Sequence, residues 1–165
     1  MGTVLRMLFL LCAVVAPIVV WTTSAPLPQR VASHFARGGH ANGFMSHDGY
    51  VLFMLAMTTI LPLVLVAAIG FVPRLATARL SIRYREHWLA PQRRAQTMAT
   101  LASFGCAFGV LLIVFLTCIH LLTVQANARV PARLDEATFF TLLVGFLVLL
   151  AAGIGFLVVR FGRPR

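Results

Sequence analysis

Four apolar stretches dominate this sequence, and each is about as long as a helix that crosses a lipid bilayer. They cover residues 3–23, 50–72, 98–124 and 138–159. Hydrocarbon offers a backbone no hydrogen-bonding partner, so a segment that crosses it must pair its own amide groups, as a helix does. The chain is 60% hydrophobic with a mean hydropathy of +0.92, which excludes a soluble domain. We therefore expect an all-α fold: one integral membrane domain, residues 1–165, forming a bundle of four transmembrane helices.

The first apolar stretch has two interpretations. Arg6 near its start and Thr23-Ser24-Ala25 near its end also match the layout of a cleavable signal peptide. Pro26 directly follows that cleavage site and disfavours cleavage. We interpret the stretch as a retained anchor, with the long Arg6 side chain reaching the cytoplasmic interface.

The arginines predict the orientation, because the side richer in basic residues stays in the cytoplasm. One side carries Arg6, Arg74, Arg79, Arg83, Arg85, Arg93, Arg94, Arg160, Arg163 and Arg165. The other side carries Arg30, Arg37, Arg129 and Arg133. We expect both termini and residues 73–97 in the cytoplasm, with the loops 24–49 and 125–137 outside.

The basic residues also indicate the compartment and the kind of partner. All 14 are arginine, which is typical of a GC-rich bacterial genome, so we expect the cytoplasmic (inner) membrane of a bacterium. They lie next to apolar stretches rather than together on one soluble surface. This placement favours membrane lipids as partners and argues against nucleic acid.

The outward loop 24–49 is more than a plain linker. Pro28 fixes its own φ and disfavours helix in the residue before it, so the first helix should end nearby. Gly39 and the pair Asn42-Gly43 favour turns, so the loop should fold back on itself. Two aromatic residues flank these turns and are expected to hold the loop at the membrane interface. They are Phe35 and Phe44.

The same loop carries a resemblance to a known family. Its residues read Leu27-Pro28, Val31, His34-Phe35, Gly39, Asn42-Gly43-Phe44 and Ser46, between two apolar stretches. This series resembles the bacterial membrane domain of unknown function at the N-terminus of the sporulation-delaying-protein immunity family. The resemblance covers roughly residues 10–75, and residues 84–94 are similar to a stretch of uncharacterised bacterial relatives with the same opening domain. It implies a multi-pass protein that protects the cell from a secreted toxic peptide and signals its presence. The chain is shorter than members of that family and lacks their second half.

We predict from this loop a site for a peptide or a membrane-protein partner. The predicted site residues are His34, Phe35, Gly39, Asn42, Gly43, Phe44 and Ser46. Two alternatives stay open. One alternative is a metal site, because the loop contains residues of metal-ligating types: His34, His40, His47 and Asp48. Their spacing matches no standard site, so our prediction is that the loop binds no metal and no cofactor. Otherwise the loop is structural, with His34 bonded to the loop's own backbone.

Polar and small residues inside the apolar stretches invite further hypotheses. His120 is an ionisable residue within the third stretch, near its outer end, where it is either interfacial or part of a proton path. Gly105 and Gly109 form a Gly-x-x-x-Gly pattern, and small residues recur over residues 151–155. Such positions favour close helix packing, either inside the bundle or in a homo-oligomer or partner interface.

The cytoplasmic segment 80–94 alternates apolar residues with arginines. We expect it to lie on the inner leaflet, with an aromatic anchor and with guanidinium groups on lipid phosphates. The residues concerned are Arg83, Arg85, Trp88, Arg93 and Arg94. The alternative is a docking site for a cytoplasmic partner. Pro91 should begin the third helix at its first position.

The sequence shows no catalytic constellation. Its acidic residues are Asp48, Glu86, Asp135 and Glu136, all outside the apolar stretches, and no nucleophile with a base or Gly-rich phosphate loop is present. We expect a protein that is not an enzyme, of immunity-like or sensing type. The alternative is an accessory subunit of a larger membrane protein complex.

Overall fold

The computed structural model describes residues 2–75 and 82–163 and is mostly helical. Its elements are α1 (Gly2–Ser24), β1 (Arg30–Phe35), β2 (Ala41–Ser46), α2 (His47–Gly70), α3 (Val72–Leu75), α4 (Arg85–Trp88), α5 (Pro91–Asn127) and α6 (Glu136–Phe161). Four of them, α1, α2, α5 and α6, are long and apolar enough to cross a membrane. The prediction of four helices of membrane-spanning length and composition is confirmed.

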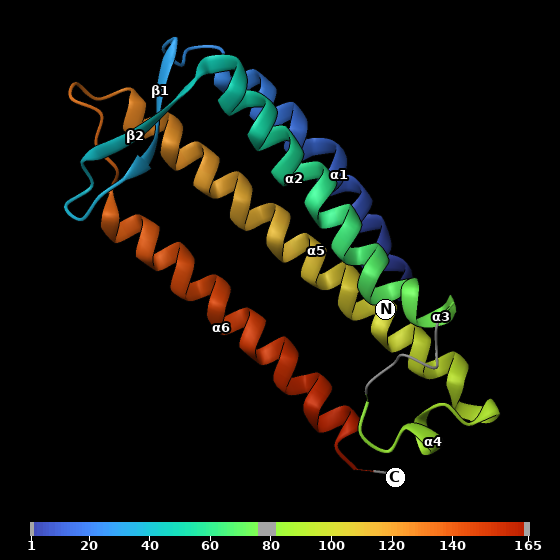
Figure 1. The fold of residues 1–165 in the computed structure, drawn as a ribbon. Coiled ribbons are helices and arrows are strands. Elements are labelled where there is room, and N and C mark those ends of the chain that lie inside the picture. The colour runs from blue at the N-terminus through green and yellow to red at the C-terminus, as the bar shows by residue number, and fades with distance from the viewer. Residues whose placement is uncertain (1, 76–81, 164–165) are drawn as a thin grey trace.

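Helix α5 is the centre of the molecule. It packs against both α1 and α2, which also contact each other, whereas α6 packs chiefly on α5 and stands apart from the other two (Figure 1). Successive long helices run in opposite directions, so α1 begins and α6 ends at the same end of the molecule (Figure 1). The four helices are therefore a three-helix core with a fourth helix on one side.

The Gly-x-x-x-Gly pattern lies inside the three-helix core. A Cβ atom added at Gly105 would lie 3.3 Å from Cγ2 of Ile69 in α2. One added at Gly109 would lie 2.7 Å from the Phe9 ring in α1, closer than real Cβ atoms come to their neighbours. Only glycine lets α1 and α2 approach α5 this closely, so this pair serves internal packing.

Helix α6 uses its small residues differently. Phe146 stacks on Phe115 of α5 with ring centroids 4.5 Å apart, and a Cβ atom added at Gly153 would lie 3.1 Å from the Phe104 ring. At Gly145 and Gly155 an added Cβ atom would meet nothing within 4 Å. Most of the surface of α6 is therefore left for lipid or for a partner.

The loop between α1 and α2 contains a β-hairpin that the all-α expectation did not include. Strands β1 and β2 pair antiparallel, from Arg30 opposite Ser46 to Phe35 opposite Ala41, with irregular register around His34. The hairpin folds over one end of the helices (Figure 1). The expectation that the loop folds back on itself is confirmed, because the two strands run side by side.

The residues that make the hairpin turn differ from the expectation in part. Gly38 and Gly39 lie in the turn with φ angles of +87° and +74°, a region that L-residues avoid. Asn42-Gly43, also expected to form a turn, lies within β2, and that expectation is wrong. Gly43 has a different role: a Cβ atom there would lie 2.9 Å from Cβ of His34 across the irregular register.

Helix α5 extends beyond the apolar stretch at both ends. Its 37 residues correspond to about 55 Å, well over the thickness of the hydrocarbon layer. Pro91 occupies the start of the helix, as predicted. The added turns carry contacts to α4 at one end and to the hairpin at the other.

Candidate functional site

The β-hairpin is fixed to the bundle by Asn127, the last residue of α5. The Asn127 side chain accepts a hydrogen bond from the backbone N–H of Ala32 (2.8 Å) and donates one to the Ala32 carbonyl (2.9 Å). It also donates to the Thr123 carbonyl within its own helix. Ala32 is almost fully buried, so without this amide its two backbone groups would lose their partners. One side chain therefore sets the position of β1 over α5.

The turn of the hairpin is fixed to the loop before α6. The Leu134 N–H donates to the Gly39 carbonyl (2.8 Å), and the Gly38 N–H donates to Oε1 of Glu136 (2.7 Å). Nε of Arg133 donates to the Gly38 carbonyl (3.1 Å). A Cβ atom at Gly39 would collide with the Leu134 carbonyl oxygen. Both the φ angle and this contact therefore require glycine at position 39.

Helix α6 begins beside this contact with a side-chain cap. The Thr138 backbone N–H and its hydroxyl both donate to the Asp135 carboxylate (3.2 and 3.1 Å). These two hydrogen bonds hold the pKa of Asp135 below its ordinary value, because they stabilise the ionised form. A charged carboxylate at this position also suits the positive end of the helix dipole.

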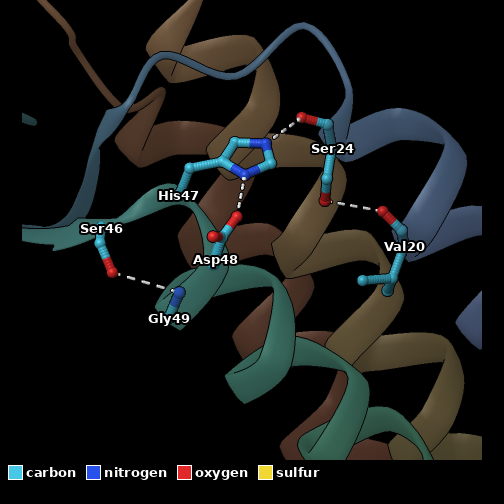
Figure 2. A network of polar contacts seen from close by, with 6 residues as sticks. All are labelled: Val20, Ser24, Ser46, His47, Asp48 and Gly49. Carbon is cyan, nitrogen blue, oxygen red and sulfur yellow. Dashed lines mark hydrogen bonds and ion pairs between the residues drawn. The ribbon is translucent and has the colours of Figure 1, made fainter.

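Helix α2 begins in a polar network that also reaches α1 (Figure 2). Ser46 caps the helix by accepting a hydrogen bond from the Gly49 N–H. The ring of His47 lies between two acceptors, Oδ1 of Asp48 (3.0 Å) and the Ser24 carbonyl (3.2 Å). Two acceptors favour the imidazolium form, in which both ring nitrogens donate. The network ties the end of α1 to the start of α2.

Beneath the hairpin lies a cavity of about 660 Å³ between β1, α5 and α6. We call it the hairpin cavity. It is lined by Ser33, His34, Phe35, Ala36, Arg37, Ile119, Leu122, Thr123, Leu134, Glu136, Phe139 and Phe140. The residues from β1 and the turn bring polar and charged groups, whereas α5 and α6 contribute mostly aliphatic and aromatic side chains. A space with this lining suits a ligand that is partly apolar and partly polar.

The predicted partner-binding residues separate into two groups. His34 and Phe35 line the hairpin cavity. The others lie in the turn or on β2 and do not line it: Gly39, Asn42, Gly43, Phe44 and Ser46. Of these, Phe44 is 46% exposed and lies under the Arg30 guanidinium at 4.7 Å. The residues of the second group therefore belong to the turn and to β2, and they contribute to the structure of the hairpin rather than to the cavity lining.

The structural interpretation expected His34 to bond to the loop's own backbone, but the hydrogen bond of its ring joins it to a side chain. Its Nδ1 atom lies 3.2 Å from the Ser33 hydroxyl, and the side chain is exposed. Gly43 leaves room for it across the hairpin. The ring is thus available to a ligand in the hairpin cavity.

His120 is fully buried between the helices. Its Nε2 atom lies 2.8 Å from the Thr23 hydroxyl of α1, and its Nδ1 atom lies 3.0 Å from the Tyr50 hydroxyl of α2. The Thr23 hydroxyl donates its hydrogen to the Val19 carbonyl (2.6 Å), so it accepts from His120 Nε2–H. Nδ1 then accepts from Tyr50, which satisfies the neutral ring. The residue links three helices.

At the other end of the molecule, Trp88 does not face lipid headgroups, and the expectation of an interfacial anchor is wrong. Its side chain is 4% exposed, packs edge-on against Phe161, and donates from Nε1 to the Phe161 carbonyl (3.2 Å). The indole therefore closes the end of α6 onto α4 and α5. The Arg160 guanidinium lies 4.7 Å above its ring.

The four arginines predicted to contact lipid are exposed in the structure. They are Arg83, Arg85, Arg93 and Arg94. Residues 80 and 81, the start of the predicted amphipathic segment, lie outside the described residues.

Sequence reasoning missed several residues of the candidate site. Asn127 and Glu136 fix the hairpin, and Phe139 and Phe140 line the cavity beneath it. A polar amide just after the third apolar stretch and an aromatic pair at the start of the fourth were the available signals.

Among residues 2–75 and 82–163, no three His, Cys, Asp or Glu side chains come together where they could hold a metal ion. Comparison of the chain with protein-family models, with curated proteins and with solved structures finds no match.

Proposed function

We propose that this chain is a multi-pass membrane protein of sensing or immunity-like type. It binds a peptide or a membrane-protein partner at the end of the bundle that the hairpin covers. The observation that carries the proposal is the hairpin cavity, because it joins a polar rim on β1 to an apolar wall on α5 and α6. A bacterial inner membrane, with both termini in the cytoplasm, is the setting that the arginine distribution supports.

The chemistry of the lining defines the ligand class. His34, Arg37 and Glu136 offer a donor or acceptor, a positive charge and a negative charge at the polar side. Phe139 and Phe140 offer aromatic surface on the other side. A membrane-active peptide carries both kinds of group, as does a segment of membrane protein at the bilayer surface, so either fits this lining.

Site-specific photo-crosslinking tests this function. A photoreactive phenylalanine analogue placed at Phe139 should form an adduct with a peptide or protein in native membranes. The same analogue at Leu52, a residue of α2 that is 70% exposed, serves as the control for random collisions. His34→Ala should reduce the adduct at Phe139, whereas Asn42→Ala on β2 should not, because Asn42 does not line the cavity. Adducts with lipid alone at both positions would refute the proposal.

An accessory role in a larger complex is the second candidate. The observation that favours it is the unused surface of α6, where Gly145 and Gly155 leave room for a neighbouring helix to approach closely. Gentle extraction followed by native mass analysis distinguishes the two candidates. A large stable assembly indicates the accessory role, whereas a protomer or homodimer, free or with a bound peptide, indicates sensing.

A further inference from the structure

A groove lies between α1 and α6 at the end of the molecule opposite the hairpin, with α5 as its floor. It encloses about 570 Å³, and its walls are the first turns of α1 and the C-terminal half of α6. We call it the α1–α6 groove. It is open to the surroundings, because Arg6 on one wall and Phe156 on the other are exposed. None of its lining residues belongs to the candidate site described above.

Two close contacts show how α1 is aligned with α5. A Cβ atom added at Gly2 would lie 3.1 Å from the Ser103 hydroxyl oxygen, and one added at Gly109 would lie 2.7 Å from the Phe9 ring. The two contacts are seven residues apart in α1 and six residues apart in α5. The two helices therefore run in the same direction and advance in step along the groove.

This alignment places Arg6 among apolar segments of the bundle. Arg6 lies between the two contacts, four residues after Gly2, and is therefore level with Ala107. The apolar stretch of α5 begins at residue 98, nine residues before Ala107, which corresponds to about 14 Å of helix. Arg6 is the one charged residue of α1. Its positive charge therefore lies at a depth where the neighbouring helix is apolar.

The described parts of the chain offer this charge no carboxylate. The acidic residues of the sequence are Asp48, Glu86, Asp135 and Glu136. Three of them lie at the hairpin end, and Glu86 lies in α4, which packs on the start of α5. The ion pair that the structure describes joins His47 and Asp48. A charge inside a membrane is costly unless it is paired, so Arg6 requires a partner from outside the chain.

The floor of the groove suits a helix as that partner. Ala99, Ser103 and Ala107 recur every four residues and form one row of small side chains along α5. Gly153 continues this low surface onto α6. Small residues let a neighbouring helix come close, and a segment at this depth must pair its own backbone groups, as a helix does.

We propose that the α1–α6 groove binds a transmembrane helix of a partner protein, and that this helix carries a carboxylate opposite Arg6. A phospholipid fits less well, because its phosphate belongs to the bilayer surface and its acyl chains carry no charge. A second copy of this chain does not supply the carboxylate, because none of its apolar stretches contains an acidic residue. The proposal rests on the accessory role described above and adds the chemistry of the partner.

Two model transmembrane peptides test the charge. Each is a leucine-rich helix with one polar residue at the depth of Arg6, glutamate in one peptide and glutamine in the other. Energy transfer between the labelled peptide and the purified full chain in phosphatidylcholine vesicles measures their association. The glutamate peptide should associate about tenfold more tightly, within the range measured for polar pairs between membrane helices.

Variants of Arg6 test whether this preference depends on its charge. Arg6→Lys keeps the charge and should keep the preference, whereas Arg6→Gln should bind the two peptides alike. Arg163→Gln is the matched control and should keep the preference, because Arg163 is exposed near the same end and does not line the groove. The comparison of the two peptides on the wild-type chain remains decisive if Arg6→Gln does not fold.

An alanine pair tests the groove itself. Ala107→Leu fills the floor beside Arg6 and should weaken binding of the glutamate peptide several-fold. Ala152→Leu makes the same change at an exposed position of α6 that does not line the groove. This second variant should bind the peptide as the wild-type chain does.

Three results would overturn the proposal. Equal association of the two peptides with the wild-type chain would show that the charge plays no part. Equal losses in Ala107→Leu and Ala152→Leu would show that the contact lies outside the groove. Loss of peptide binding when phosphatidylglycerol replaces part of the phosphatidylcholine would make a lipid phosphate the ligand of Arg6. None of these results bears on the crosslinking at the hairpin cavity or on the native mass analysis, which test the functions proposed above.

Discussion

At the scale of single residues, the hydrogen bonds of His120 join helices that are far apart in sequence. Thr23 and His120 are 97 residues apart, and Tyr50 and His120 are 70 apart. A polar group in the apolar interior costs free energy unless it is paired, so these bonds favour the one arrangement that satisfies all three side chains. The cluster therefore sets how α1, α2 and α5 meet.

Thr23→Val tests this cluster by removing the hydroxyl that His120 Nε2 contacts. We expect the free energy of unfolding to fall by about 1 kcal/mol, the usual cost of one such bond between membrane helices. Thr22→Val is the matched control, because Thr22 is exposed and bonds only to its own helix. The measurement is unfolding of the detergent-solubilised protein. Equal losses in the two variants would mean that the bond between helices contributes nothing.

Gly39 and Gly38 form a second matched pair. Both have positive φ, so alanine at either position should cost about 1 kcal/mol from backbone strain. Gly39→Ala should cost more, because its Cβ atom also collides with the Leu134 carbonyl, whereas at Gly38 the nearest atom belongs to the His40 side chain at 3.3 Å. Faster tryptic cleavage after Arg37 in Gly39→Ala than in Gly38→Ala would report the loosened turn. The reverse order would show that the contact with Leu134 does not hold the hairpin.

At the scale of elements, the hairpin depends on helices for its position, since a two-stranded hairpin alone is marginally stable in water. Asn127 supplies the bonds to β1, and the loop before α6 supplies those to the turn. The hairpin and the two helices beneath it therefore enclose the hairpin cavity together. A movement of α6 would alter the shape of the hairpin cavity but would leave the three-helix core largely unchanged.

Asn127→Leu should release β1 from α5. The substitution leaves the buried N–H and C=O of Ala32 without partners, at a cost of roughly 1–3 kcal/mol for each group. We expect the Ala32 amide to exchange its hydrogen at least about tenfold faster, measured by hydrogen exchange and mass spectrometry. Gln125→Leu, an exposed position two residues earlier, should leave this amide protected. If Ala32 stays protected in Asn127→Leu, another contact positions the strand.

The elements also show what the sequence could and could not predict. Apolar stretches of sufficient length located all four long helices, because hydropathy is a local property. The hairpin was missed because its position comes from Asn127, which lies 95 residues from Ala32. Trp88 was misjudged for the same reason: its partner Phe161 is 73 residues away. Local patterns thus predicted which segments are long and apolar enough to cross a membrane, whereas contacts between distant segments determine the candidate site.

At the scale of the whole molecule, those arginines of the two groups that the structure describes lie at opposite ends. Arg30, Arg37, Arg129 and Arg133 lie in or beside the hairpin and the loop that it contacts. The larger group includes Arg6 at the start of α1 and Arg160 at the end of α6, which lie at the other end. The end that holds the start of α1 and the end of α6 therefore carries more positive charge than the hairpin end. The positive-inside rule predicts that this more positive end faces the cytoplasm.

Cysteine labelling of intact cells tests this direction. Val130 is 99% exposed in the loop before α6, and Arg163 is exposed just after α6. If the hairpin end faces outward, as proposed from the arginines, a maleimide that cannot cross membranes should label Val130→Cys directly and Arg163→Cys only after permeabilisation. The wild-type chain gives the background from its three native cysteines, all of which lie within helices. If only Arg163→Cys were labelled in intact cells, the protein would have the opposite orientation in the membrane. The hairpin cavity would then open toward the cytoplasm, and its ligand could not be a peptide that arrives from outside.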